Sequence, residues 1–138
     1  MSTERLDLHL MVGYACRSRN SVLVHPKDDS LYIKSMGNLL CFESLNESGE
    51  QKLLHGHDMP VTAIAISDSG SYIASGQMGT NKYKGQASPV IVWDGFSGQV
   101  LNTLDGLTVR VNHVSFSQDD RFLCGCGEVS LNTCDTKG

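Results

Sequence analysis

Three segments decide the fold of this chain: Leu54-His55-Gly56-His57, Val61-Thr62-Ala63-Ile64-Ala65-Ile66 and Val90-Ile91-Val92-Trp93-Asp94. The second and third are rich in β-branched residues, which predicts β-strands. A turn-like segment, residues 67–70, and a further strand-like run, residues 72–76, lie between them. The order is therefore a Gly-His element, two strands joined by a short turn, and a third strand that ends in Trp-Asp.

The same plan occurs three times along the chain, which makes an internal repeat the main evidence for fold. A fourth, outer strand is predicted after the first and second copies. In the third copy Cys134-Asp135 stands where the second has Trp93-Asp94. The strands predicted in the first copy are 21–26, 31–33, 37–43 and 51–54, those in the second are 61–66, 72–76, 90–94 and 99–104, and those in the third are 113–117 and 121–124.

This repeat resembles the WD repeat, in which each unit of about 40 to 45 residues forms one four-stranded blade of a β-propeller. The resemblance implies an all-β chain. Closed propellers have roughly four to eight blades, so 138 residues provide about three, the third incomplete, and we expect no closed ring from this chain alone. The predicted units are an N-terminal strand segment (1–18), blade one (19–57), blade two with a long inter-strand loop at 78–89 (58–106) and incomplete blade three (107–138).

The resemblance also implies a structural role for four residues of the second unit: His57, Ser75, Trp93 and Asp94. In WD repeats a histidine, a strand serine and an indole N–H satisfy one another inside the blade. A further aspartate usually stands between the second and third strands, but residues 78–89 contain none, so we expect the network to be incomplete or re-routed. This interpretation outweighs nucleophilic catalysis, because no third group or oxyanion site accompanies the histidine and serine.

The five cysteines give no metal-site pattern, and we expect no cofactor. Cys124-Gly125-Cys126 places two thiols on one face of a strand, where His113 or Cys134 could add ligands. Structural zinc sites usually use better-defined spacings such as Cys-x-x-Cys pairs. We therefore predict buried, reduced thiols, as suits a reducing compartment.

Composition narrows the remaining classes of function. The formal net charge is −4, with the basic residues scattered, which argues against binding to nucleic acid. The sequence has no apolar run approaching the roughly 18 residues of a membrane span, and residues 1–7 lack a signal-peptide pattern, so we expect a cytoplasmic protein without a membrane partner. Within the loop 78–89, Lys82, Tyr83 and Lys84 form a compact basic and aromatic group that could contact an acidic partner surface, although a solvated loop is the simpler interpretation.

A longer set of motifs narrows the resemblance to microtubule-associated WD-repeat proteins of cilia and flagella. These are Val12-Gly13-Tyr14, His25-Pro26, Leu54-His55-Gly56-His57, and residues 65–77 ahead of a long insertion and Trp93-Asp94. The echinoderm microtubule-associated-protein-like family is a close rival, since it carries a similar Gly-Tyr and Ala-Ser-Gly-Gln-like segment. Both resemblances imply tubulin or the microtubule doublet, with neighbouring axonemal proteins, as partners.

The sequence therefore predicts a non-catalytic scaffold or interaction module, a microtubule-associated protein of the lumen of ciliary or flagellar doublets. The alternative is a general WD-repeat adaptor in a soluble cytosolic complex. An enzyme or metal protein that uses the cysteines ranks last. Because a third unit without its outer strands exposes an unpaired sheet edge, we also expect the isolated chain to be marginally folded.

Overall fold

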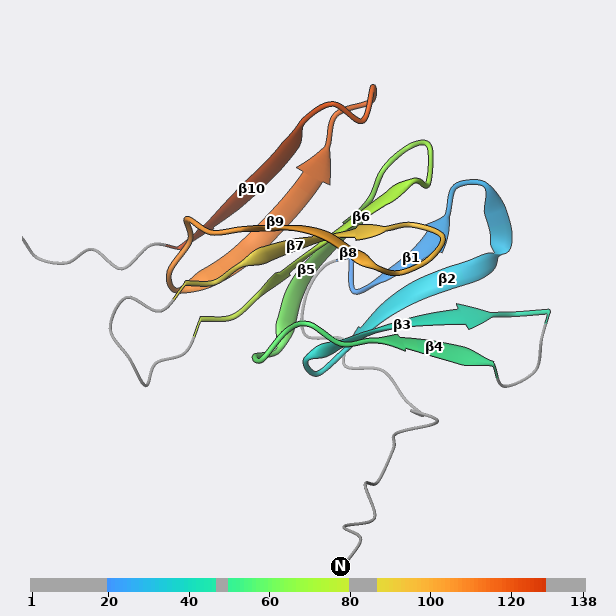
Figure 1. Ribbon diagram of the computed structural model, residues 1–138, viewed down its shortest axis with the longest axis horizontal. Helices are drawn as coiled ribbons and strands as arrows, with labels where there is room; N and C mark the ends of the chain where they lie inside the picture. Colours follow the sequence, from blue (N-terminus) through green and yellow to red (C-terminus); the bar gives the residue numbers. More distant parts are fainter. Residues whose placement is uncertain (1–19, 47–49, 80–86, 129–138) are drawn as a thin grey trace, which may run out of the picture.

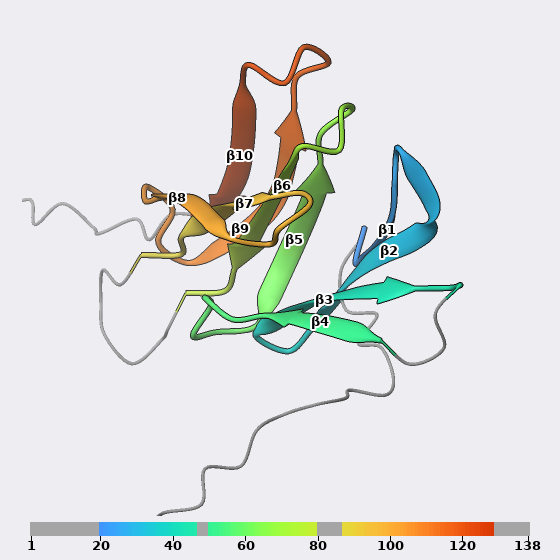
Figure 2. The same ribbon diagram turned by 45° about the vertical axis from the view of Figure 1, so that its right-hand side comes forward.

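The computed structural model describes residues 20–46, 50–79 and 87–128, which form ten β-strands in three antiparallel sheets (Figures 1 and 2). The predicted N-terminal strand segment, 1–18, lies outside the described residues. No helix with the length and apolarity to span a membrane occurs in the described part of the chain.

The first sheet is a four-stranded meander in the order β1-β2-β3-β4. Its register places Ile33 opposite Phe42, and Leu40 opposite Leu54. Gly37, at a φ of 60°, allows the two-residue turn between β2 and β3. The strands are β1 (Val22–His25), β2 (Asp28–Met36), β3 (Leu39–Ser44) and β4 (Gln51–Leu54).

The second sheet repeats this topology in the order β5-β6-β7-β8. Its register pairs Ile73 with Trp93 and Ser75 with Ile91, and Val90 with Leu104. The strands are β5 (Val61–Ile66), β6 (Tyr72–Gln77), β7 (Val90–Asp94) and β8 (Val100–Leu104).

The third sheet is a hairpin of β9 (Arg110–Phe116) and β10 (Leu123–Glu128). Phe116 pairs with Leu123 at the turn end. Residues 129–138 of the predicted third unit lie outside the described residues, so β10 has a partner strand on one edge only in the described structure.

The second sheet lies between the other two (Figure 2), and its first strand, β5, contacts the first strands of both neighbours, β1 and β9. Hydrogen bonds also cross both junctions. The Val61 N–H donates to the Gly37 carbonyl oxygen over 2.8 Å, and the Thr62 hydroxyl donates to the Val111 carbonyl oxygen over 2.5 Å. Three stacked antiparallel sheets with their first strands side by side form a segment of a radial array.

Alternation along the strands gives the second sheet two different faces. One face packs against the first sheet in a core of large side chains: Ile33, Leu40, Phe42, Leu54, Val61, Ile64, Ile73, Ile91 and Trp93. The other packs against the third sheet through smaller ones: Ala63, Ala74, Val90, Val111 and Val114. At Gly76 a Cβ would lie 2.3 Å from Val111 Cγ1, so glycine is what allows this closer approach.

Candidate functional site

A chain of buried polar side chains runs through the second sheet on the face toward the first. Ser75, on β6, is its centre: the Trp93 indole N–H donates to Ser75 Oγ over 2.7 Å, and Ser75 Oγ lies 2.6 Å from His57 Nε2. Ser75 is 0% exposed, Trp93 1% and His57 5%. The structure thus brings together three of the four residues predicted for the blade network.

Two residues that the sequence analysis did not include extend this chain to the surface. His57 Nδ1 lies 2.7 Å from Gln77 Oε1, and Gln77 Nε2 donates to Asp58 Oδ1 over 2.6 Å. Gln77 is buried, whereas Asp58 is exposed. The re-routing expected from the missing loop aspartate therefore runs through a glutamine on β6 and an aspartate next to the histidine.

The donors and acceptors along the chain favour one tautomer of His57. An indole N–H can only donate, so Ser75 Oγ accepts from it and has its own hydrogen available for His57 Nε2. At the other end a carboxylate can only accept, which directs the Gln77 amide nitrogen to Asp58 and its oxygen to His57 Nδ1. This arrangement places a hydrogen on Nδ1 and suits a neutral imidazole whose Nε2 accepts from Ser75.

Electrostatics agree with a neutral imidazole. Burial lowers the pKa of His57 below its ordinary value of 6.5, and the hydrogen bond to Gln77 and the charge of Asp58 offset only part of this effect. A neutral histidine that donates at one nitrogen and accepts at the other can hold its neighbours in place. Because Ser75 is fully buried and both its hydrogen-bonding roles are used, the arrangement offers no free nucleophile.

The structure corrects the prediction for Asp94, the fourth residue expected in the network, because its side chain lies outside it. Its carboxylate accepts from the backbone N–H groups of Phe96 and Ser97, over 3.0 and 2.6 Å, and so closes the turn between β7 and β8. Those bonds, that of Ser97 first, hold the pKa of Asp94 below its ordinary value. The physical reason is strand alternation: Trp93 faces the first sheet, so its neighbour cannot share that face.

The sequence contains a signal that could have identified Gln77. Alternate residues of a strand share a face, so Gln77, two positions after Ser75, lies on the same side of β6. A glutamine two residues beyond a buried serine at the end of a strand is well placed to replace a missing loop aspartate. The two-residue period of a strand would thus have added Gln77 to the predicted network and excluded Asp94 from it.

The remaining predictions concern the loop residues and the cysteines. Lys82, Tyr83 and Lys84 fall in 80–86, outside the described residues. Cys41 is buried, but Cys124 and Cys126 are exposed, which corrects the expectation of buried thiols there. The reason is that these two face away from the second sheet, and no described strand covers that side of β10. The part of the chain that the structure describes contains no group of three potential metal ligands.

Comparison with known proteins assigns the fold. A family model described as "WD domain, G-beta repeat" matches residues 49–83 and 98–131, half of the 138 residues. A solved structure titled "Structure of U3-55K" superposes on 75% of this chain and 31% of its own, with a TM-score of 0.61 and 25% sequence identity. The chain belongs to the WD-repeat family, and the prediction of an all-β, partial β-propeller is confirmed. Its sheets are therefore blades, the third incomplete among the described residues.

Curated relatives are also similar over most of the chain. "Cilia- and flagella-associated protein 52" of Chlamydomonas reinhardtii is 32% identical over 90% of this chain and 20% of that protein. The protein of the same name from Homo sapiens is 30% identical over 88% of this chain and 19% of that protein. "WD repeat-containing protein 90" of Mus musculus is 29% identical over 91% of this chain and 6% of that protein. The chain thus spans about a fifth of the length of the first two. The predicted resemblance to ciliary WD-repeat proteins is confirmed as a sequence similarity.

Replacing the central hydroxyl tests the network. In Ser75→Ala the Trp93 N–H and His57 Nε2 lose their shared partner inside the blade, so we expect the free energy of unfolding to fall by about 1–3 kcal/mol. Urea titration followed by circular dichroism measures this change. Ser115→Ala, at an exposed position of β9, is the control and should stay within about 0.5 kcal/mol of the wild type. Equal effects of the two substitutions would contradict the network.

The lowered pKa of His57 also predicts a pH dependence. The unfolded chain binds a proton near pH 6.5 that the folded chain binds only at lower pH, so the contribution of His57 to stability is complete above 6.5 and is lost as pH falls below it. Urea midpoints measured from pH 7 to 5 should fall more steeply for the wild type than for His57→Gln, which keeps a donor and an acceptor but does not titrate. His113→Gln, at an exposed histidine, should keep the wild-type slope. Parallel curves for wild type and His57→Gln would show that the imidazole is not held neutral.

Proposed function

We propose that this chain is a non-catalytic scaffold of ciliary or flagellar axonemes that is bound to the microtubule doublet. The observation that carries the proposal is the similarity to proteins named "Cilia- and flagella-associated protein 52" over about nine-tenths of the chain. The similarity extends beyond the Trp-Asp element to the segment before and after it, which a general WD repeat does not require. The tubulin lattice and its neighbouring axonemal proteins are the proposed partners.

The geometry of the chain supports a scaffold role. The buried polar network joins β6, β7 and the segment that leads into β5, and its serine and histidine are buried with their polar atoms hydrogen-bonded within the network. WD-repeat blades offer protein-binding surface in their loops and at their strand edges. Lys82, Tyr83 and Lys84 are the proposed contact residues for an acidic surface such as that of tubulin.

A second candidate is a general WD-repeat adaptor in a soluble cytosolic complex. The observation behind it is the similarity to "WD repeat-containing protein 90", a protein named for its repeats alone, over nearly the same share of the chain. The two candidates differ in one measurable property. A doublet-bound scaffold stays with the axoneme when weakly attached proteins are removed, whereas an adaptor is recovered with soluble partners.

Quantitative mass spectrometry of axonemes before and after a high-salt wash tests the proposal. We expect peptides of the tagged chain, expressed in ciliated cells, to remain with the washed axonemes. Replacement of Lys82, Tyr83 and Lys84 by alanine should lower this retention several-fold, because the loop loses two positive charges and an aromatic ring. Substitution of Thr80 and Asn81 by alanine in the same loop is the matched control and should leave retention unchanged.

Loss of the wild-type chain into the soluble fraction would favour the adaptor and reduce the ciliary similarity to one of fold. If the wild type and the triple variant are retained equally, the scaffold proposal stands, but Lys82, Tyr83 and Lys84 are not the contact residues.

A further inference from the structure

The chain contains two Asp-Gly pairs, Asp94-Gly95 and Asp105-Gly106. Glycine lacks the side chain that would shield its peptide nitrogen, so in such a pair this nitrogen can reach the carboxyl carbon of the aspartate. Attack by the nitrogen converts aspartate into isoaspartate through a cyclic imide, without an enzyme. The reaction requires that the fold leaves both the carboxylate and the peptide nitrogen free to move, and the two pairs differ in both respects.

The pair Asp94-Gly95 is held at every reacting group. The Asp94 carboxylate accepts from the backbone N–H groups of Phe96 and Ser97 over 3.0 and 2.6 Å. The Gly95 N–H donates to the Ser71 carbonyl oxygen over 2.7 Å. A Cβ on Gly95 would collide with the backbone of the turn between β5 and β6, so the peptide is also enclosed. The fold therefore protects this pair.

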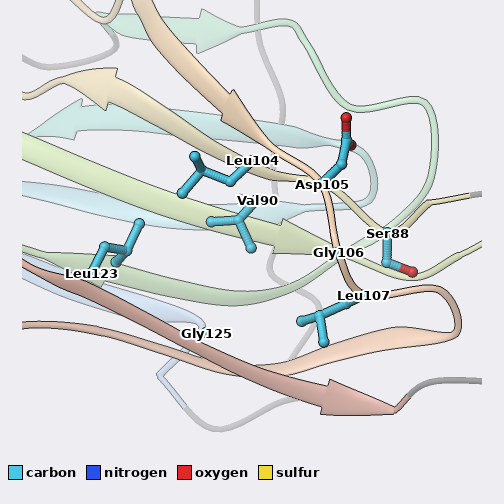
Figure 3. Close-up of a pocket in the computed structure, with 8 residues that line it drawn as sticks. All are labelled: Ser88, Val90, Leu104, Asp105, Gly106, Leu107, Leu123 and Gly125. Atoms are coloured by element: carbon cyan, nitrogen blue, oxygen red, sulfur yellow. The ribbon is translucent and has the colours of Figure 1, made fainter.

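The pair Asp105-Gly106 lies in the connection from β8 to β9, and both of its residues are exposed. Leu104 ends β8 on one side, and on the other the Leu107 carbonyl oxygen accepts from the Ser88 N–H over 2.6 Å. Figure 3 shows the Asp105 carboxylate directed away from the side chains of Leu104 and Leu107. Between these two anchors, neither reacting group has a hydrogen-bond partner among the described residues.

Exposure at this position is a property of the connection between neighbouring blades. One blade earlier, His55 and Gly56 occupy the same place, directly after the outer strand β4. The core between the first and second sheets covers the preceding Leu54, yet His55 and Gly56 are both exposed. A covered outer strand thus leaves the dipeptide that follows it in solvent.

The backbone requires glycine at position 106. Gly106 has a φ of 151°, a conformation that residues with a Cβ rarely adopt. A larger residue would shield the peptide nitrogen from attack, but it would strain the connection. The fold therefore keeps a reactive Asp-Gly pair at this exposed place.

We propose that Asp105 is a modification site, at which the chain isomerises spontaneously to isoaspartate. The Gly106 nitrogen bonds to Asp105 Cγ, and the carboxyl hydroxyl leaves with the amide hydrogen as one water molecule. Water then adds to the imide. Cleavage of the bond between the nitrogen and the original main-chain carbonyl carbon gives isoaspartate, and cleavage of the new bond restores aspartate. The net reaction changes no mass and needs no oxidant, reductant or cofactor.

Isoaspartate lengthens the main chain between the second and third sheets by one methylene and leaves a carboxylate on the former main-chain carbonyl carbon. That carboxylate is the group to which an L-isoaspartyl methyltransferase transfers a methyl group from S-adenosylmethionine, with S-adenosylhomocysteine as the other product. The modified chain is therefore a substrate of this class of enzyme. The inference does not depend on a ciliary location.

Peptide mapping of the purified full chain, kept for several weeks at neutral pH and body temperature, tests the proposal. The tryptic peptide 85–110 contains both Asp-Gly pairs, so fragmentation by electron transfer measures the site and its internal control in one molecule. We expect isoaspartate to accumulate at least about tenfold faster at Asp105 than at Asp94, where hydrogen bonds must break first. In the same chain unfolded in urea, the two rates should become similar.

Asp105→Glu is the blocking variant, because glutamate keeps the charge but would have to close a larger, six-membered ring. Methyl transfer to the aged protein by an L-isoaspartyl methyltransferase should fall several-fold in this variant. Asp29→Glu, at an exposed aspartate that precedes a serine, is the matched control and should accept methyl groups as the wild type does.

Three results would overturn the proposal. One is equal accumulation of isoaspartate at Asp94 and Asp105 in the chain without urea. Another is isoaspartate at Asp105 in urea but none without it, which would show that the fold protects this pair as well. The third is equal methyl transfer to the wild type and to Asp105→Glu.

Discussion

The hydrogen bond from the Trp93 indole to Ser75 is the interaction on which the described structure most depends. It fixes β7 to β6 from inside the blade, and through His57 it also fixes the segment that leads into β5. A buried polar atom without a partner is costly, so each member of this chain is constrained by the next. A ring held at this one place can pack against the first sheet in a single way.

That constraint accounts for the unequal faces of the second sheet. With the indole directed toward the first sheet, the large side chains of β5 and β6 gather on the same side, and the alanines face the third sheet. Gly56 is required where the ring rests, and Gly76 where Val111 approaches.

Much of the fold could be predicted from the sequence because strand-forming residues and turn residues alternate with a clear period. The strand predicted at 90–94 is β7, and that predicted at 51–54 is β4. The boundaries of the predicted units and the roles of the loop residues stay predictions. The Trp-Asp pair predicts Asp94 in the network, but adjacent residues of a strand face opposite sides, and its carboxylate closes the turn after β7 instead. Gln77 is predictable from its place two residues after Ser75 on one face of β6, whereas its contact with Asp58 joins positions 19 residues apart, which no local pattern reveals.

The exposure of Cys124 and Cys126 illustrates a different limit. A strand-like run predicts a buried face only if another sheet covers it, and the sequence of the run cannot specify that cover. In the described structure β10 is covered on the side of the second sheet alone. Local pattern therefore predicted the strand correctly, whereas its burial depends on what packs against it.

Nitrogen-15 NMR of the labelled chain at pH 7 tests the central claim most directly, because Trp93 is the sole tryptophan and gives a single indole N–H signal. The structure predicts that this signal exchanges with solvent only as fast as the strand amides of β6. It also predicts imidazole shifts of a neutral His57 with its hydrogen on Nδ1. Fast indole exchange, or a His57 that is protonated or carries its hydrogen on Nε2, would contradict the hydrogen-bonded chain from which this account is built.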